Sequence, residues 1–296
     1  MDGAGEAAAA SEAGHRRYRS YLYVPATDAH RIERALASTA DALVVDLEDA
    51  VPDHRKDESR AAARALVSGS PAKPVFVRVN GARSGLLDAD LDAVARGDLT
   101  GVRLPKAESP EEVAAVLERL RQRGCHAPVV PIVESALGVE HAFAIAAVPG
   151  VAALAMGEAD LRLDLGTAAD EVLDYARARC VVASAAAGLP GPVQSVCTQL
   201  DDEQLLLDTT RKGRAMGFGG RSAVHPRQLA VINEVFTPSD EERRWAQTVV
   251  DASRQAQATG AAVAVTASGE LVDRPVLRRA LAILELCDSA GTVLNP

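Results

Sequence analysis

Aromatic residues are scarce in this sequence and make up 3% of its 296 positions. A large core must therefore be aliphatic, in a chain that is 48% hydrophobic. No apolar run reaches the ~18 to 20 residues that cross a bilayer, so we expect no membrane partner. Residues 1–14 lack the basic start and apolar centre of a signal peptide. We expect a disordered tail over residues 1–18 and a cytoplasmic protein.

Cysteines are also few, and their spacing fits no metal or redox motif. The four thiols are Cys125, Cys180, Cys197 and Cys287. We expect them to stay free in a reducing compartment. The formal net charge of −9 disfavours a surface for nucleic acid, although a local basic pocket for an anionic substrate remains compatible with it.

Two common enzyme signatures are missing. No G-x-G-x-x-G sequence follows the first predicted strand, and residues 217–220 come too late in the chain to replace it. This disfavours an open, doubly wound nucleotide-binding sheet, the rival fold for this pattern. The G-x-S-x-G turn of serine hydrolases is absent too.

The sequence does contain eight short β-rich runs, with helical patterns between most of them. They cover residues 21–24, 42–48, 74–80, 101–105, 128–133, 151–156, 192–198 and 220–224. Strands that alternate with helices indicate βαβ units and a parallel sheet. Eight repeats predict an α/β fold of the (β/α)8 TIM-barrel type over residues 19–237.

The composition changes after the eighth run. Residues 239–259 predict a charged helix, residues 261–272 a hairpin turned at Ser268 and Gly269, and residues 275–289 a final helix. A barrel does not need this part. We therefore expect residues 238–296 to form a C-terminal helical and hairpin extension that caps the barrel or contacts a neighbouring subunit.

Two apolar runs end in carboxylates, Glu134 and Asp160. The carboxyl ends of barrel strands form the active-site face, so we expect both acids at one rim. Two carboxylates at such a rim suit a hard cation such as Mg²⁺. The alternative is that both are helix caps or solvated loop residues.

A third and a fourth strand end add charged groups to this rim. Arg78 can stabilise a developing enolate or thioester oxygen beside the metal. Asp46, Glu48 and Asp49 can order metal-bound water. Alternatively, Arg78 pairs with an acid, and the three acids cap a helix or form salt bridges with Arg55 or Lys56. The complete set favours making or breaking a carbon–carbon bond next to a carbonyl.

Two further residues have less specific interpretations. Lys106 ends the fourth strand and is a candidate for holding an anionic substrate, for forming a Schiff base, or for a solvated charge. His225 follows the eighth strand, and we interpret it as structural rather than as a base.

Several segments, in their order along the chain, resemble the HpcH/HpaI aldolase and citrate lyase β-subunit family in its acyl-CoA lyase branch. They are residues 19–25, 46–51, 78–80, 104–106, 160–161 and 223–228, together with Glu134. The resemblance extends from Arg19 to the last predicted helix. Two departures are Glu158, where a smaller residue is common, and residues 191–194, where the family usually has an acid.

The resemblance implies a (β/α)8 barrel with Mg²⁺ on Glu134 and Asp160 and with Arg78 beside the substrate carbonyl. It also implies trimers or hexamers in which the C-terminal segment covers a neighbour's active site. That segment carries a catalytic acid in the family, and Asp273 matches it. Taken alone, Asp273 reads as the N-cap of the last helix. We expect substrate contacts from Arg19, Lys106, Gly157, Glu158 and Ala159.

The expected activity is Mg²⁺-dependent cleavage or formation of a 3-hydroxy-acyl thioester such as malyl-CoA, citramalyl-CoA or a citryl thioester. The products are a 2-keto acid and acetyl-CoA or a similar thioester. Three alternatives stay open: an acyl-CoA thioesterase, a CoA-independent pyruvate aldolase, and a subunit that acts only with an acyl-carrier protein.

Overall fold

The computed structural model describes residues 17–259 and 263–293, with side chains as far as Cys287. Most of the tail expected over residues 1–18 lies outside this description. The chain divides into two compact units, Met1–Asn233 and Glu234–Pro296.

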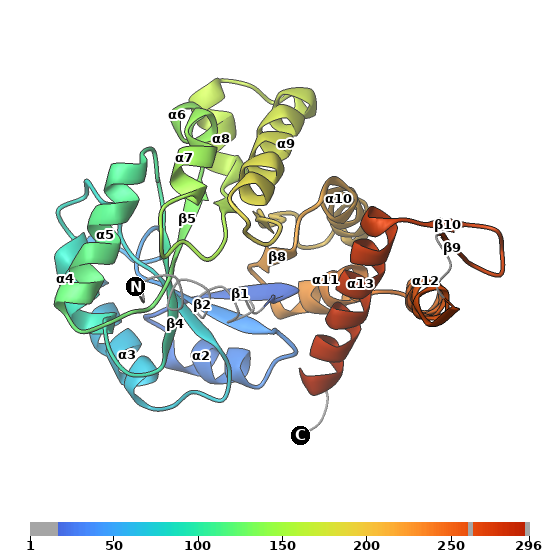
Figure 1. The fold of residues 1–296 in the computed structure, drawn as a ribbon. Coiled ribbons are helices and arrows are strands. Elements are labelled where there is room, and N and C mark those ends of the chain that lie inside the picture. The colour runs from blue at the N-terminus through green and yellow to red at the C-terminus, as the bar shows by residue number, and fades with distance from the viewer. Residues whose placement is uncertain (1–16, 260–262, 294–296) are drawn as a thin grey trace, which may run out of the picture. The chain divides into compact units, whose positions relative to one another are not determined.

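The first unit is a closed barrel of eight parallel strands, which runs in chain order from β1 to β8 and confirms the predicted (β/α)8 fold (Figure 1). The strands are β1 (Ser20–Pro25), β2 (Ala42–Asp46), β3 (Val75–Arg78), β4 (Leu99–Leu104), β5 (Val129–Val133), β6 (Ala155–Met156), β7 (Val193–Gln194) and β8 (Gly220–Ala223).

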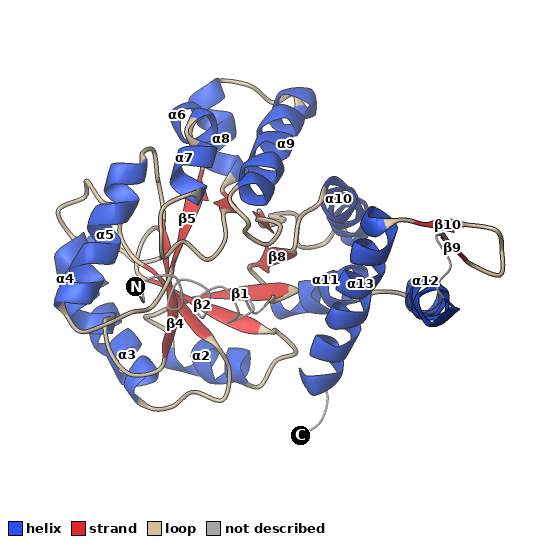
Figure 2. Cartoon of the chain, in the orientation of Figure 1, coloured by secondary structure: helices blue, strands red, loops and turns tan. Residues whose placement is uncertain are grey.

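Helices enclose these strands, as the colouring by secondary structure shows (Figure 2). They are α2 (Ala29–Leu36), α3 (Lys56–Ser68), α4 (Leu87–Val94), α5 (Pro110–Gln122), α6 (Ala136–Glu140), α7 (Ala142–Ala146), α8 (Glu158–Leu165), α9 (Asp170–Ala186), α10 (Glu203–Met216) and α11 (Leu229–Phe236), with 3-10 turns at Asp53–Arg55 and Pro226–Gln228. Pro110 at the start of α5 directly follows the N-cap Ser109, a position where the missing N–H of proline is tolerated.

The barrel core is largely aliphatic but contains an aromatic cluster. Tyr18, Tyr21 and Phe76 pack edge to face, with ring centroids 5.6 to 5.7 Å apart. Tyr21 lies near the start of β1, so the cluster fills the amino-terminal end of the barrel. The opposite end, where the strands finish, is left for polar side chains.

Strands β6 and β7 are shorter than the sequence predicted. Each contains two residues, and Val151 forms only an isolated bridge to Val129. Near β7, a Cβ on Gly191 would lie 2.2 Å from the carbonyl oxygen of Gly217. Pro192 lacks a backbone N–H for the ladder, and this limits strand pairing before Val193.

The second unit contains the expected helices and hairpin. Helix α12 (Asp240–Thr259) packs against α13 (Arg274–Val293) around Ala246, Val249, Val250 and Ala280. Strands β9 (Ala264–Val265) and β10 (Leu271–Val272) pair antiparallel across a turn that contains Gly269 at φ 88°. Residues 261–262 of the predicted hairpin lie outside the described residues.

Two smaller expectations are also tested. Cys125, Cys180 and Cys197 are free thiols, as predicted. Within residues 17–259 and 263–293, no helix combines the length and the apolar character needed to cross a membrane.

Candidate active site

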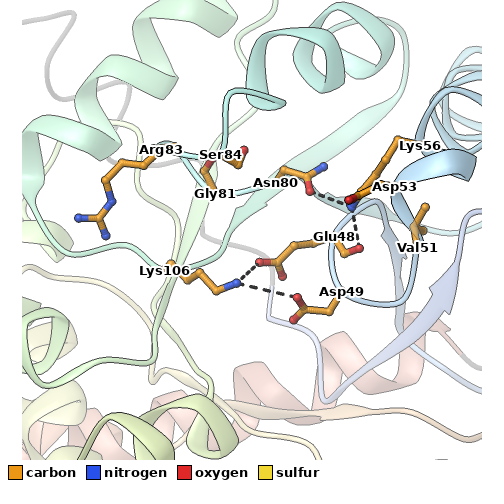
Figure 3. Close-up of a pocket in the computed structure, with 11 residues that line it drawn as sticks. Glu48, Asp49, Val51, Asp53, Lys56, Asn80, Gly81, Arg83, Ser84 and Lys106 are labelled. Carbon is orange, nitrogen blue, oxygen red and sulfur yellow. Dashed lines mark hydrogen bonds and ion pairs between the residues drawn. The ribbon is translucent and has the colours of Figure 1, made fainter.

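The predicted polar side chains gather where the barrel strands end. A cavity of about 430 Å³ opens there between the loops that follow β2, β3 and β4. Glu48, Asp49, Asn80 and Lys106 line it, and Figure 3 shows Lys106 extending toward the two acids. The cavity belongs to the active-site end of the barrel.

Arg78 is held by the neighbouring strand. Asp46 and Arg78 are register partners in β2 and β3, so their side chains leave the sheet side by side. Arg78 Nε and Nη2 donate to the two carboxylate oxygens of Asp46, each at 2.7 Å. Burial works to lower the pKa of Arg78, but the bonds and charge of Asp46 outweigh it and raise that pKa.

Both carboxylate oxygens of Asp46 are occupied by hydrogen bonds. Asp46 is 2% exposed, and its oxygens also accept the backbone N–H groups of Glu48 at 3.0 Å and Ala50 at 3.1 Å. The acid therefore orients Arg78 and the loop that carries Glu48. This geometry favours such an orienting role over the ordering of metal-bound water, which was the sequence interpretation.

Glu48 lies between two cations. Its Oε2 is 3.0 Å from Arg78 Nη1, and its Oε1 accepts from Lys106 Nζ at 2.8 Å. Burial raises the pKa of Glu48, and the two cations oppose this. The buried Oε2 accepts no hydrogen bond despite its ion pair. Asp49 is more exposed, 3.5 Å from Arg78 and 3.9 Å from Lys106.

The alternative interpretation, in which these acids form salt bridges with Arg55 or Lys56, is not seen among the described residues. Arg55 binds Glu58 instead, with its Nη2 2.7 Å from Oε1. Lys56 is buried and donates to the carbonyl oxygens of Leu47 and Glu48. The reason is geometric: the acids project into the barrel mouth, whereas Lys56 closes the carboxyl end of β2 from the side of α3.

Lys106 joins the two sides of the rim. Its backbone takes the left-handed conformation at φ 55°, which is uncommon for a residue with a side chain. In this conformation its N–H donates to Glu134 Oε1 at 2.7 Å while its ammonium reaches Glu48. Strained backbone of this kind persists where the surrounding contacts determine it, often at functional sites.

Glu134 follows β5 and is 5% exposed. Burial raises its pKa to about 8, and the nearby charges of Asp160 and Glu48 add to the rise. Gly157 is required beside it, because a Cβ there would lie 2.2 Å from Glu134 Oε2. Asp160 lies in the first turn of α8. The two acids are thus close, and they repel each other.

These two carboxylates fit a divalent cation. Within the described residues, no group of three or more His, Cys, Asp or Glu side chains forms a ready metal cage. Mg²⁺ does not need one, because it binds one or two carboxylates and takes its other ligands from water and substrate. Glu134 and Asp160 supply hard oxygen donors, and the charge of Asp160 adds to the rise that burial causes in the pKa of Glu134.

The expected substrate contact of Arg19 is corrected by its position. Arg19 precedes β1, and its Nε and Nη2 bind Asp41 just before β2, at 2.9 and 2.7 Å. Both residues lie at the amino ends of their strands. A substrate at the carboxyl rim of the same barrel is therefore out of reach of Arg19.

The three residues after β6 that were expected to contact substrate have different surroundings. Gly157 is the N-cap of α8 beside Glu134, and Ala159 is exposed on the first turn. The Glu158 side chain instead binds Arg177 of α9. Of this run, Gly157 therefore lies nearest to the cluster.

Two residues act as caps. His225 Nδ1 accepts the backbone N–H of Arg227 at 3.1 Å, in agreement with the structural interpretation of this histidine. Asp273 Oδ1 accepts the N–H of Val276 at 2.9 Å, as expected for the N-cap of α13. This bond uses one Asp273 oxygen.

Sequence reasoning did not identify a buried polar chain behind Glu48. Lys56 Nζ also donates to Asn80 Oδ1 at 2.9 Å, and Asn80 Nδ2 donates to Asp90 at 2.6 Å. Arg60 Nε completes the chain by donating to Asp90 Oδ1 at 2.8 Å. A usable signal was Asn80 directly after a strand that ends in Arg78.

Arg103 was also missed. It is the register partner of Arg78, is 1% exposed, and stacks 4.3 Å above the Tyr21 ring. Its Nη1 lies 3.3 Å from Ser222 Oγ and 3.4 Å from the Tyr23 hydroxyl. An arginine inside a strand that is otherwise apolar was the available signal.

The chain matches known proteins over nearly all of its length. A family model described as HpcH/HpaI aldolase/citrate lyase matches residues 19–226. A citrate lyase subunit beta-like protein of Deinococcus radiodurans is 35% identical over 90% of this chain and 96% of its own. The mitochondrial citramalyl-CoA lyase of Homo sapiens is 33% identical, over 94% of this chain and 89% of its own.

Two further likenesses concern activity and fold. A (3S)-malyl-CoA thioesterase of Cereibacter sphaeroides is 34% identical over 86% of this chain and 90% of its own. The crystal structure of the protein CitE from Mycobacterium tuberculosis, in complex with magnesium, acetoacetate and coenzyme A, superimposes with a TM-score of 0.76. That protein is 29% identical and covers 93% of this chain and 99% of its own. The chain therefore belongs to the HpcH/HpaI aldolase/citrate lyase family.

Proposed function

We propose that the protein is a Mg²⁺-dependent carbon–carbon lyase that acts on a 3-hydroxy-acyl thioester of the malyl-CoA, citramalyl-CoA or citryl type. The observation that carries this is the rim itself, where the Glu134 and Asp160 pair lies next to the Arg78, Glu48 and Lys106 cluster. The lyases and the magnesium complex among its relatives support the same activity.

The cation would be held by Glu134 and Asp160. Bound there, Mg²⁺ supplies Lewis acidity that polarises the hydroxy-acid end of the substrate and favours loss of its hydroxyl proton. Gly157 keeps the space beside Glu134 open. The N–H of Lys106 fixes one carboxylate oxygen, so that the other is directed toward the ligand side.

Arg78 would stabilise the charge that cleavage creates. In the retro-aldol direction, the bond between the hydroxyl-bearing carbon and the thioester α-carbon breaks. Its electron pair passes to the thioester, whose oxygen becomes an enolate. The Arg78 guanidinium, held by Asp46, is a preorganised donor for that oxygen. The other product is a 2-keto acid.

The enolate carbon must then take a proton, and we assign this step to Asp273 of a neighbouring subunit. The family resemblance around Asp273 supports the assignment, as does the expectation of a homotrimer or homohexamer. The test is to mix Arg78→Ala and Asp273→Ala proteins, each of which should be inactive alone. Recovered activity in the mixture supports shared sites, and a mixture without activity contradicts them.

Thioester hydrolysis is the second candidate, because a related protein is a (3S)-malyl-CoA thioesterase. The same enolate-stabilising residues would serve it, with free CoA as the product. A CoA-independent aldolase and a carrier-protein-dependent subunit are less favoured alternatives. Activity of the purified chain on CoA thioesters would argue against both of these alternatives. The proposed compartment is the cytoplasm.

A product assay tests this assignment. The purified chain is given malyl-CoA, citramalyl-CoA and citryl-CoA, with Mg²⁺ and again with excess EDTA, and the products are separated by chromatography. Metal-dependent acetyl-CoA together with a keto acid is the expected result. Free CoA without acetyl-CoA would replace the lyase by a thioesterase, and no product from any of the three would reject the CoA substrates.

A further inference from the structure

Glu158 and Arg177 form a buried ion pair behind the β5–β6 side of the rim. Arg177 Nε donates to Glu158 Oε1 at 3.0 Å, and its Nη2 donates to Oε2 at 2.5 Å. Arg177 is 8% exposed. A two-bond arginine–carboxylate contact of this kind sets orientation as well as distance.

The pair joins three helices. Glu158 begins α8, Arg177 lies on α9, and Arg177 Nη1 also binds Asp174 at 2.7 Å. Asp174 in turn accepts from Lys212 of α10 at 2.8 Å. The first turn of α8 is thereby tied to the outer helices of the barrel.

This turn also carries Asp160, two residues after Glu158. Two further bonds hold the same helix. The Glu158 N–H donates to Ser195 Oγ at 3.1 Å, and Asp164 Oδ2 accepts the N–H of Ala136, two residues after Glu134, at 2.7 Å. The contacts of Glu158 thus hold the turn that carries Asp160, and the Asp164 bond ties α8 to the segment after Glu134.

The cation expected at these acids makes that position important. Mg²⁺ demands nearly ideal octahedral geometry at short distances, so a small displacement of one carboxylate weakens binding. Loss of Arg177 would leave the Glu158 carboxylate without its partner, and loss of Glu158 would leave Arg177 with Asp174 alone. Either change would release the first turn of α8 from α9.

We propose that Glu158 and Arg177 are positioning residues for the metal site, which hold Asp160 at binding distance from the cation shared with Glu134. The inference rests on the proposed function, because it requires a metal at these acids. It gives a role to Glu158, whose carboxylate is directed at α9 and away from the substrate.

Direct binding of Mn²⁺ tests the proposal without reference to turnover. The free ion is followed by electron paramagnetic resonance in the full-length protein, in Arg177→Met, in Glu158→Gln and in the double variant. Each single change should weaken Mn²⁺ binding by about tenfold, the lower end of the range for residues behind a metal ligand. The double variant should be close to either single one, since both changes break the same contact.

A control on the same two helices separates positioning from simple packing. Arg162, two residues after Asp160, lies in the last turn of α8 and binds Asp170 of α9. Arg162→Met should leave Mn²⁺ affinity within about twofold of wild type, as expected for an exposed pair. Arg177→Lys should restore part of the loss, and saturating Mg²⁺ should return kcat of Glu158→Gln toward wild type.

The outcomes are distinct. Wild-type Mn²⁺ affinity in a folded Glu158→Gln protein would overturn the positioning role, whatever happens to its melting temperature. Equal losses in Arg162→Met and Arg177→Met would also overturn it, because any α8–α9 contact would then suffice. Wild-type protein that binds no Mn²⁺ would reject both the inference and the metal site. Protein that binds metal as expected but yields no lyase products would reject the proposed function alone.

Discussion

The two halves of the barrel rim differ in how their charges are balanced. On the β2–β4 side, Asp46 and Glu48 meet Arg78 and Lys106 at 2.7 to 3.0 Å. On the β5–β6 side, neither Glu134 nor Asp160 forms a salt bridge with any residue that the structure describes. The charges of the first half are balanced by described residues, and we propose that a bound cation balances those of the second.

This difference assigns separate tasks to the two halves. A charge-matched arginine with a two-bond partner is rigid before any substrate arrives, as required for stabilising a transition state. A buried carboxylate beside a second, partly buried one is costly without a cation, and the pair becomes favourable when a divalent ion binds. The loop residue Lys106 contacts both halves, through its backbone on one side and its side chain on the other.

Removal of the Arg78 guanidinium from the β2–β4 side of the rim should have the largest effect. Arg78→Ala is expected to lower kcat/KM by about 10³-fold, since it deletes a preorganised donor to the enolate oxygen. Arg78→Lys should recover only part of this, because an ammonium cannot form the two parallel bonds to Asp46. Steady-state kinetics measures both. Exposed Arg119→Ala is the matched control, and near wild-type turnover in Arg78→Ala would remove Arg78 from catalysis.

On the β5–β6 side of the rim, loss of a carboxylate should lower activity by weakening the binding of Mg²⁺. Asp160→Asn is expected to weaken apparent Mg²⁺ affinity by on the order of 10²-fold or more, because it removes a charged ligand. Titration of activity with Mg²⁺, after removal of bound metal by EDTA, measures this shift. Glu171→Gln, an exposed acid on α9, should keep the wild-type midpoint. Equal midpoints for Asp160→Asn and wild type would contradict the assignment.

Substitution of a buried lysine behind the β2–β4 side of the rim should lower the free energy of unfolding. Lys56→Met removes three buried hydrogen bonds, to the carbonyl oxygens of Leu47 and Glu48 and to Asn80 Oδ1, at a cost of about 1–3 kcal/mol. Urea unfolding measures this loss. Arg64→Met, on the exposed side of the same helix, should change stability by less than about 0.5 kcal/mol. A Lys56→Met protein as stable as Arg64→Met would show that these bonds contribute little.

The smallest effect concerns α9, which carries Arg177 behind the β5–β6 side of the rim. Burial raises the pKa of Cys180 from 9.0 to about 12, so the folded state keeps a proton that the unfolded state loses above pH 9. The stability that this thiol contributes is complete below pH 9 and declines as pH rises toward 12. By pH 10 the decline is about 1.4 kcal/mol.

Urea unfolding at pH 7 and pH 10 tests this prediction. Cys180→Ala lowers stability at both values by creating a small cavity, but the part of the pH dependence that comes from Cys180 should disappear. An unchanged difference between the two pH values in the variant would show that the thiol does not titrate in this range. Both proteins contain the same other titrating groups. Subtracting the pH-dependent change in unfolding free energy of Cys180→Ala from that of wild type therefore isolates the contribution of Cys180.

Local pattern was sufficient to predict the barrel. Each strand is a short apolar run followed by a helical period, and these signals depend on near neighbours in the chain. The hairpin turn at Gly269 and the Asp273 cap are equally local. Placing Glu134 at the carboxyl rim followed from one rule, that parallel strands share their ends.

For Arg19, the position directly before the first strand indicated its role better than the family resemblance did. Its place directly before an apolar run implies the amino end of β1, where it binds Asp41. The expected substrate contact came from its membership of a matching segment. A residue that stabilises the fold can belong to such a segment as readily as one that binds substrate.

The sequence by itself determined the eight βα repeats, the C-terminal helices and the presence of acids at strand ends, because these depend on hydrophobic period and on turn chemistry. Only the tertiary structure decided which charges meet. Arg78 with Asp46, Lys56 with Asn80, and Glu158 with Arg177 are 32, 24 and 19 residues apart. Packing of neighbouring βα units brings each pair together, and burial then makes each contact selective, since a charge removed from water needs its partner.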